Sequence, residues 1–532
     1  MPHLERCVAD GARPRSSMMN GTKVIDIGGL GQLRANVLSH GSGRSTLEAL
    51  NVPFARPPIE SLRFRPPQPP MPWSHIHDGT RFGPGCIQNG TYMNYTFPID
   101  EDCLQLNVWA PLNAAPKAVL VWAFGGGLTV GSGVAYNGSK LAQLGNIVVV
   151  TINYRLGALG FYSSLEQAAE DTATGGLNGV LDMLQALKFV RAHIGAFGGD
   201  PSRVTLAGQS SGAVGSCVLA FSPIATGLFH QLILESGACT GPWMGPDPSV
   251  KGSLNASKSF ARDVGCATGS LSCLRSLPAT RLTTSSQWGD LNFGIDDYLL
   301  HAAPANASVA SRVPLLIGSN NEDTTCATAI APPMPPANAS ALHASLLSYF
   351  GDDAEDLLRP YLRAASIDPS HIRDRDAKAL WLNMSRDAGA SCPSLWLARR
   401  FTSLSLPVYM YELEFNETLA GEGVLHGGEL DLVWQRPPAT SLPAAADLAA
   451  AVGHYWSSFV STGVPAAPSS WPAWPRFEAP VNAPSDRFLD FTSSGRAAAK
   501  ERFRTEACEM WESYRAKGES QRQRFTDFGY LC

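Results

Sequence analysis

Short apolar runs that end in glycine are the most regular feature of this chain. Residues 118–124 are uniformly apolar and run into Gly125-Gly126-Gly127, which is typical of a buried strand followed by a loop. Residues 203–207 alternate and are rich in β-formers, whereas residues 213–220 are small and apolar. We therefore predict a strand, then a helix, with Ser210 at their junction. A further apolar run, residues 314–317, predicts another strand.

The strand-to-helix junction carries the motif Gly-x-Ser-x-Gly, here Gly208-Gln209-Ser210-Ser211-Gly212. A serine hydroxyl is a poor nucleophile at neutral pH, so an acyl-transfer enzyme exposes it on a sharp turn beside a general base and an oxyanion site. Gly208 and Gly212 leave room for such a turn. The motif predicts a nucleophile elbow, with Ser210 as the nucleophile.

The glycine run after residue 124 supplies context for this motif. In a hydrolase of this architecture, backbone N–H groups at that place face a developing oxyanion. Taken alone, Gly125-Gly126-Gly127 is equally consistent with a flexible turn. Its position after an apolar strand and before a serine elbow favours the functional interpretation.

Ordered matches along nearly the whole chain make it resemble the type-B carboxylesterase/lipase family, the cholinesterase-like group of the α/β-hydrolase fold. Besides the elbow, the matching segments are residues 51–58, 62–67, 101–108, 149–157, 178–182, 455–456, 462–463 and 471–472. The resemblance implies an α/β fold with a large, mostly parallel central sheet flanked by helices, and insertions that form an active-site gorge.

The resemblance also implies a catalytic triad in the chain order Ser, acid, His. His426, within Gly423-Val424-Leu425-His426-Gly427-Gly428-Glu429-Leu430, resembles the family's base. Two carboxylates, Glu322 and Asp323, follow residues 314–317. Asp323 falls where the family carries its catalytic acid, and we prefer it to Glu322 as the group that orients the imidazole.

The same resemblance assigns the oxyanion hole to the backbone N–H groups of Gly126, Gly127 and Ser211. Phe124 and Ser211 depart from the residues usual in the family, but backbone donors do not depend on side-chain identity. Trp243 matches an acyl-pocket tryptophan, and core packing explains it equally well. We therefore take Trp243, Gln209 and Phe124 as tentative pocket residues.

Choline esters are poor candidate substrates for this sequence. Cholinesterases hold a quaternary ammonium with a tryptophan in the first cystine loop and a glutamate just before the nucleophile. Here the segment between Cys86 and Cys103 contains no tryptophan, and Gln209 takes the place of the glutamate. We expect uncharged or apolar esters, small-molecule or lipid.

Composition fits a large globular enzyme. The chain has 532 residues, 44% hydrophobic, with a net charge of −5, which gives no basic field for nucleic acid. No apolar run reaches the ~18 residues that span a bilayer. We expect a disordered segment at 1–20, one domain at 21–515 and a C-terminal tail at 516–532. Proline- and alanine-rich patches at 331–337 and 437–446 are expected to be surface excursions.

The eleven cysteines fit the family's disulfide scheme better than a metal site, and we expect neither a metal nor a cofactor. The resemblance implies three pairs: Cys86–Cys103, Cys266–Cys273 and Cys392–Cys508. Five cysteines are left unassigned: Cys7, Cys217, Cys239, Cys326 and Cys532. Of these, Cys217 is expected to pack as a small hydrophobic residue. Cys532 could link subunits or remain a free thiol.

Disulfides and Asn-x-Ser/Thr sequons favour a secreted protein or one of the secretory-pathway lumen. The sequons are at Asn20, Asn89, Asn94, Asn137, Asn255, Asn306, Asn338, Asn383 and Asn416. Residues 1–17 contain no apolar region of the kind found in signal peptides. The sequence leaves open an incomplete start, a lost signal or an intracellular protein, and we favour the first two.

Two classes of function remain. The favoured one is a serine carboxylesterase, for which an interfacial lipase or an amidase is a variant that the motifs do not separate. The other is a cholinesterase-like adhesion or binding protein that has lost the chemistry. The presence of Ser210, Asp323, His426 and the three glycines favours the enzyme.

Overall fold

The computed structural model describes residues 17–529, except 41–42, 90–91, 93–95, 114, 171–174, 245–248, 267–268, 290, 292, 324–335, 417–422, 438–441 and 479–485. The side chains of 17–20, 243, 519, 527 and 529 are likewise outside the description. Its strands are β1 Ser17–Asp26, β2 Gln32–His40, β3 Arg44–Pro53, β4 Ile76–Gly79, β5 Gly85–Cys86, β6 Ile99–Asp100, β7 Gln105–Pro111, β8 Lys117–Ala123, β9 Val148–Ile152, β10 Gly199–Gln209, β11 Gln231–Glu235, β12 Leu315–Asn320, β13 Val408–Leu413, β14 Phe488–Phe491 and β15 Ala497–Lys500.

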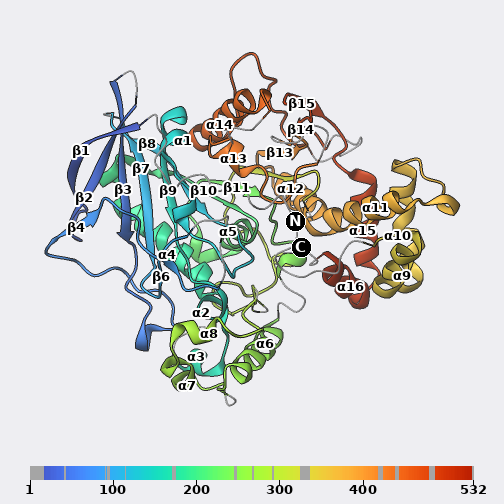
Figure 1. Ribbon diagram of the computed structural model, residues 1–532, viewed down its shortest axis with the longest axis horizontal. Coiled ribbons are helices and arrows are strands. Elements are labelled where there is room, and N and C mark those ends of the chain that lie inside the picture. The colour runs from blue at the N-terminus through green and yellow to red at the C-terminus, as the bar shows by residue number, and fades with distance from the viewer. Residues whose placement is uncertain are drawn as a thin grey trace.

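One large mixed sheet organises the fold, with the order β1-β2-β3-β7-β9-β8-β10-β11-β12-β13-β14-β15 (Figure 1). The run from β9 to β14 is parallel, while β1, β2, β3, β7 and β15 pair antiparallel with their neighbours in that order. The central strands β8, β9 and β12 are buried along their length and mostly apolar, as expected for a sheet covered on both faces.

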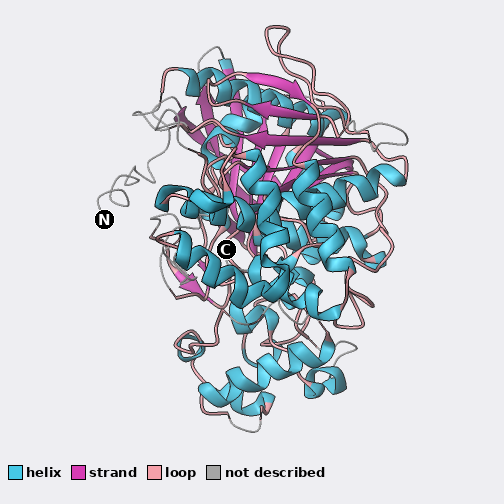
Figure 2. Cartoon of the chain, turned by 90° about the vertical axis from the view of Figure 1, so that its right-hand side faces the viewer, coloured by secondary structure: helices cyan, strands magenta, loops and turns pink. Residues whose placement is uncertain are grey.

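Helices pack around this sheet, as Figure 2 shows for one side. They are α1 Ser139–Gly145, α2 Gly157–Phe161, α3 Leu165–Glu170, α4 Asn178–His193, α5 Ser211–Phe221, α6 Val250–Asp263, α7 Leu271–Ser276, α8 Ala279–Leu282, α9 Ala339–Phe350, α10 Ala354–Ala364, α11 Asp374–Arg386, α12 Cys392–Ser403, α13 Leu430–Val433, α14 Ala444–Thr462, α15 Thr505–Ala516 and α16 Glu519–Gly529. The architecture confirms the expected α/β fold and is consistent with an α/β-hydrolase.

The carboxyl ends of the parallel strands lie along one edge of the sheet, where open α/β folds place their sites. Gln209 at the end of β10 is in register with Glu235 at the end of β11, and Glu235 with Gly318 in β12. Gly208 is likewise in register with Ala123, the last residue of β8. The segments that follow β8, β10 and β12 therefore emerge side by side.

The predicted strand at 118–124 is β8, residues 203–207 lie in β10, and residues 213–220 lie in α5. Two of the expected segments, 1–20 and 516–532, differ from the structure. Strand β1 begins at Ser17 and pairs with β2, inside the segment expected to be disordered. Of the patch at 437–446, residues 438–441 lie outside the described residues; Pro443 and Ala446 are exposed, and α14 begins at Ala444, because alanine favours helix.

The expected C-terminal tail also contributes to the folded core. It contains α16, whose Phe525 and Phe528 are buried. The ring of Phe528 lies 5.8 Å from that of Trp511 and 4.9 Å from that of Phe350. The aromatic spacing of this helix becomes meaningful only against the side chains of α9 and α15.

Four disulfide bonds join described cysteines. The three expected bonds, Cys86–Cys103, Cys266–Cys273 and Cys392–Cys508, are present. The expectation for Cys217 is wrong, because it is bonded to Cys239. Helix α5 follows β10, and Cys239 lies just beyond the adjacent β11, so the pairing depends on the strand order. Cys7, Cys326 and Cys532 lie outside the described residues.

Candidate active site

Ser210 occupies a strained turn between β10 and α5. Its backbone angles are φ 55° and ψ −131°, a conformation that L-residues seldom adopt and that the surrounding structure must hold. The Ser210 N–H donates to the carbonyl of Glu235 at 2.9 Å, and the Val214 N–H donates to the Ser210 carbonyl at 2.9 Å. The turn is therefore anchored to β11 on one side and α5 on the other, as in a nucleophile elbow.

Glycines make this turn sterically possible. A Cβ on Gly208 would lie 2.5 Å from the carbonyl group of Gly212, and a Cβ on Gly212 would lie 2.2 Å from the carbonyl oxygen of Ala123. A Cβ on Gly125 would lie 2.7 Å from the Cβ of Ser210. At each of these positions a side chain would collide with neighbouring backbone or with Ser210. The glycine loop after β8 therefore packs directly against the elbow.

His426 and Asp323 meet on the loops after β13 and β12. The His426 Nδ1 lies 2.7 Å from the Asp323 Oδ1, and Asp323 is fully buried. The Asn320 N–H donates to the other Asp323 oxygen at 2.8 Å. A carboxylate held in this way fixes the imidazole with its proton on Nδ1 and its lone pair on Nε2.

Glu322, the alternative acid, has a different place. Its N–H donates to the carbonyl of Val424 at 3.1 Å, and Glu322 forms a parallel bridge with Leu425. A Cβ on Gly423 would lie 2.2 Å from the Glu322 carboxyl carbon. Glu322 therefore ties the acid loop to the histidine loop, while the contact with the imidazole Nδ1 comes from Asp323.

The Gln209 side chain reaches the second ring nitrogen of His426. Its Nε2 lies 3.3 Å from the His426 Nε2, and Gln209 is 3% exposed. Because Nδ1 faces the carboxylate, Nε2 can accept this amide hydrogen bond. Gln209 thus occupies the lone pair that a general base would use.

The candidate oxyanion donors are backbone N–H groups of the glycine loop and of the first residue of α5. Gly126 and Gly127 have φ of 125° and 61°, and no carbonyl of the described residues accepts their N–H groups. Ser211 begins α5, where the first N–H groups have no partner within the helix. Its Oγ accepts a hydrogen bond from the Leu128 N–H at 3.3 Å, which links the glycine loop to the elbow.

Aromatic rings support the glycine loop. Phe124 is fully buried and stacks on Tyr154, with ring centroids 4.4 Å apart. The Tyr154 hydroxyl donates to the Phe124 carbonyl at 2.6 Å. Tyr92, in the first cystine loop, shares a 2.6 Å hydroxyl contact with Tyr136, and a Cβ on Gly126 would lie 3.2 Å from the Tyr92 ring. Burial raises the pKa of Tyr92 to about 12, so it stays neutral.

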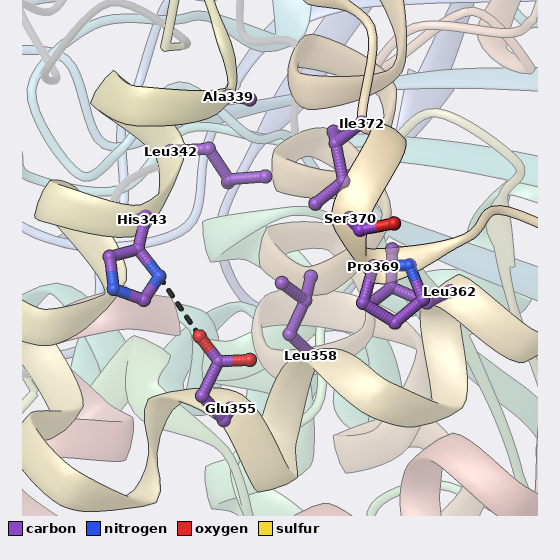
Figure 3. A pocket seen from close by; sticks show the side chains of 9 residues that line it. All are labelled: Ala339, Leu342, His343, Glu355, Leu358, Leu362, Pro369, Ser370 and Ile372. Carbon is purple, nitrogen blue, oxygen red and sulfur yellow. Dashed lines mark ion pairs between the residues drawn. The ribbon is translucent and has the colours of Figure 1, made fainter.

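Two further features are the turn that holds Trp243 and a separate cavity. Trp243 belongs to the short helical turn Pro242–Met244, and its side chain is outside the described residues. A cavity of about 240 Å³ lies between α9, α10 and the turn Pro369–His371, with the 2.9 Å His343–Glu355 pair at its rim (Figure 3). None of these elements carries a predicted catalytic residue.

Sequence reasoning missed several residues that contact the site. Asn320 and Tyr154 bond to its loops, and Glu235 and Glu429 are buried beside it. Glu429 lies three residues after His426, and Asn320 lies three before Asp323, so both were near motifs already singled out. The side-chain amide of Asn320 bonds to Glu429 and to the Leu425 carbonyl, which are distant in the chain, and local sequence does not report such contacts.

Among the residues that the structure describes, no helix is long and apolar enough to cross a membrane. The four disulfide bonds fit an oxidising compartment, such as the secretory pathway.

Comparison with known proteins places the chain in one family. Residues 22–511 match the carboxylesterase family. Fumonisin B1 esterase of Sphingopyxis macrogoltabida is 32% identical over 81% of each chain. Carboxylesterase 4A of Bos taurus is 31% identical over 80% of this chain and 85% of its own. Cocaine esterase of Oryctolagus cuniculus is 32% identical over 84% and 89%. The chain belongs to the carboxylesterase family, a family of ester hydrolases.

Proposed function

We propose that this protein hydrolyses carboxylic esters through an acyl-enzyme on Ser210. The observation that carries the proposal is the 2.7 Å contact between His426 Nδ1 and Asp323 Oδ1. The opposite ring nitrogen contacts Gln209, the residue before a serine held at φ 55° on a strand-to-helix turn. A buried carboxylate on Nδ1 leaves Nε2 as the basic atom, which is the requirement for general-base catalysis.

In the proposed reaction, His426 Nε2 takes the proton of the Ser210 hydroxyl as its oxygen attacks the ester carbonyl. The N–H groups of Gly126, Gly127 and Ser211 hold the tetrahedral oxyanion. The imidazolium, stabilised by Asp323, returns the proton to the leaving alcohol. Water then attacks the acyl-enzyme with the same base and releases the acid and Ser210.

We further propose that the substrate is uncharged or apolar rather than a choline ester. Gln209 is a neutral amide beside Nε2, and the ring of Tyr92 near Gly126 brings no carboxylate to that side of the glycine loop. A quaternary ammonium would find no anion at these two positions. The relatives are named for esters as different as fumonisin B1 and cocaine, which supports the reaction class rather than one substrate.

The test is hydrolysis of p-nitrophenyl acetate, butyrate and octanoate, together with labelling by a fluorophosphonate. Ser210→Ala should lower kcat by about 10⁶-fold and abolish the covalent adduct. Ser216→Ala is the matched control, because its hydroxyl bonds to Gly212 within α5 and takes no part in the reaction. A folded wild type with neither turnover nor adduct would favour a binding protein without catalysis.

We also infer that the protein passes through the secretory pathway and carries N-glycans. The side chains of Asn255, Asn306 and Asn338 are exposed, whereas Asn383 is half-buried and accepts a hydrogen bond from Arg386 at 2.7 Å. Glycosidase treatment of protein from its native source should lower its mass, with glycans at the exposed sites. An unchanged mass would contradict the inference.

A further inference from the structure

Two buried carboxyl groups lie within electrostatic range of each other or of the Asp323–His426 pair. Glu235 ends β11 and is fully buried, and Glu429 precedes α13 and is 2% exposed. Burial, then the charge of Asp323, raises the pKa of Glu429 to about 7. Burial, then the charge of Glu429, raises the pKa of Glu235 well above its usual value. Each group therefore favours protonation of the other.

Each carboxyl has one bonded and one unbonded oxygen. The Trp456 indole N–H donates to Glu235 Oε1 at 2.7 Å, and the Asn320 amide donates to Glu429 Oε2 at 2.5 Å. Glu235 Oε2 and Glu429 Oε1 are buried and have no hydrogen-bond partner among the described residues. Two buried carboxylates that repel each other and have unbonded oxygens are costly when both are ionised, and one proton relieves the repulsion.

The groups that face the pair come from five places. Asn320 is the last residue of β12, and Asp323 follows that strand. The others are His426 in its loop, Tyr411 on β13 and Trp456 on α14. Asp323 is negative, and the pKa of the Tyr411 hydroxyl is raised well above its usual value by burial and by these carboxylates, so Tyr411 stays neutral. His426 becomes positive only when it takes a proton in the reaction.

Asn320 connects this pair to the proposed triad. Its backbone N–H donates to Asp323 at 2.8 Å, while its side-chain amide bonds to Glu429 and, at 2.8 Å, to the carbonyl of Leu425, the residue before His426. One residue thus contacts the acid, the histidine loop and Glu429. The charge of Glu429 also favours the imidazolium form of His426.

We propose that Glu235 and Glu429 share one proton at pH 8, carried by Glu235, and that the charge left on Glu429 positions the Asp323–His426 pair through Asn320. The predicted effect on catalysis rests on the proposed hydrolase function. The shared proton does not depend on it. Each carboxyl accepts one side-chain hydrogen bond, Glu235 from Trp456 and Glu429 from Asn320. His426 faces Glu429 and favours its ionised form as well, so we assign the proton to Glu235.

Glu235→Gln and Glu429→Gln are the matched variants that test it. Glu235→Gln retains a neutral hydrogen-bond donor beside an ionised Glu429, so kcat/KM at pH 8 should stay within about threefold of wild type. Glu429→Gln removes the charge and should lower kcat at least about tenfold with little change in KM. Its acid limb of log kcat against pH should change in slope from near two to near one, because only His426 then titrates. Equal kinetic effects of the two variants would overturn the positioning role.

Infrared spectroscopy detects the protonated carboxyl group directly. At pH 8, wild type should show the carbonyl stretch of a buried protonated carboxyl, Glu429→Gln should keep it, and Glu235→Gln should lose it. A wild-type spectrum without this band would overturn the shared proton. If Glu429→Gln does not fold, the presence of the band in wild type and its loss in Glu235→Gln still test whether Glu235 carries the proton. Fluorophosphonate labelling of wild type tests the hydrolase function separately, so the two failures are distinguishable.

Discussion

The side-chain amide of Gln209 lies against the basic nitrogen of His426. The two nitrogens, Gln209 Nε2 and His426 Nε2, are 3.3 Å apart, while the other ring nitrogen faces Asp323 at 2.7 Å. The imidazole is therefore held on both sides, by a carboxylate and by an amide. The amide N–H stabilises the neutral ring, and the ring must leave it to take the serine proton.

Gln209→Met should move the acid limb of kcat/KM to higher pH. Methionine keeps the length of the buried side chain but cannot donate to Nε2, so protonation of the ring no longer costs a hydrogen bond. A bond of roughly 1 kcal/mol corresponds to a shift of about half a pH unit or slightly more. The pH profile of p-nitrophenyl butyrate hydrolysis measures it.

Gln185→Met is the control for this variant, because Gln185, on α4, is also buried and bonds to the Phe54 carbonyl. Its pH profile should match wild type. A shift of the Gln209→Met profile to lower pH would instead indicate that the amide oxygen faces the ring.

Asp323→Asn should lower kcat by about 10⁴-fold, because an amide cannot hold the proton on Nδ1 and the wrong tautomer results. Glu322→Gln keeps the backbone bridge to Leu425 and should retain activity within about threefold of wild type. Steady-state kinetics of the two variants, with circular dichroism to check folding, compare the two carboxylates. The reverse pattern of activities would assign the acid to Glu322.

Removal of single disulfide bonds should destabilise the protein in order of loop length. Paired Cys→Ala changes should cost about 5 kcal/mol for Cys392–Cys508, about 3 for Cys217–Cys239 and about 2 for Cys266–Cys273 by loop entropy, because the loops span 116, 22 and 7 residues. Urea unfolding of the three variants measures the order. A variant lacking the Cys217–Cys239 bond with wild-type stability would contradict the contribution of that bond.

The buried glutamate pair should make the protein less stable as pH rises from 5 to 8. The pKa of Glu429 in the folded protein is about 7, well above its ordinary value. At pH values between the two, Glu429 is protonated in the folded protein and ionised in the unfolded chain. The native state therefore binds more protons in this window, and the free energy of unfolding falls with pH. Between pH 5 and 8, Glu429→Gln should reduce this fall in the free energy of unfolding by on the order of 2 kcal/mol relative to wild type. Denaturant titrations at several pH values measure the difference, and parallel slopes would contradict it.

Much of the site could be predicted from local sequence, because its turn and glycine loop depend on backbone conformation. Ser210 requires a strand, a strained turn and a helix in succession, and all three are encoded within residues 203–220 by β-formers, flanking glycines and small residues. The glycine run after β8 is local in the same way. Such signals depend on backbone conformation, which neighbouring residues largely set.

Contacts between distant segments could not be read in this way. The choice of Asp323 over Glu322 came from a family resemblance, since both carboxylates follow the same strand. Cys217–Cys239 went unseen because α5 and the segment after β11 become neighbours only through the strand order. The helix α16 was taken for a tail, since its aromatic residues have meaning only beside Trp511 and Phe350.

The sequence by itself indicated the strand-to-helix junction at Ser210, because periodicity and glycine placement act over a few residues, and its resemblance to a family implied the α/β class and the chain order of the proposed triad. Only the tertiary structure decided that Asp323 faces His426, that Gln209 meets the opposite nitrogen and that Glu235 lies buried with Glu429. Side-chain hydrogen bonds and burial depend on which strands adjoin. That adjacency exists only after the sheet has formed.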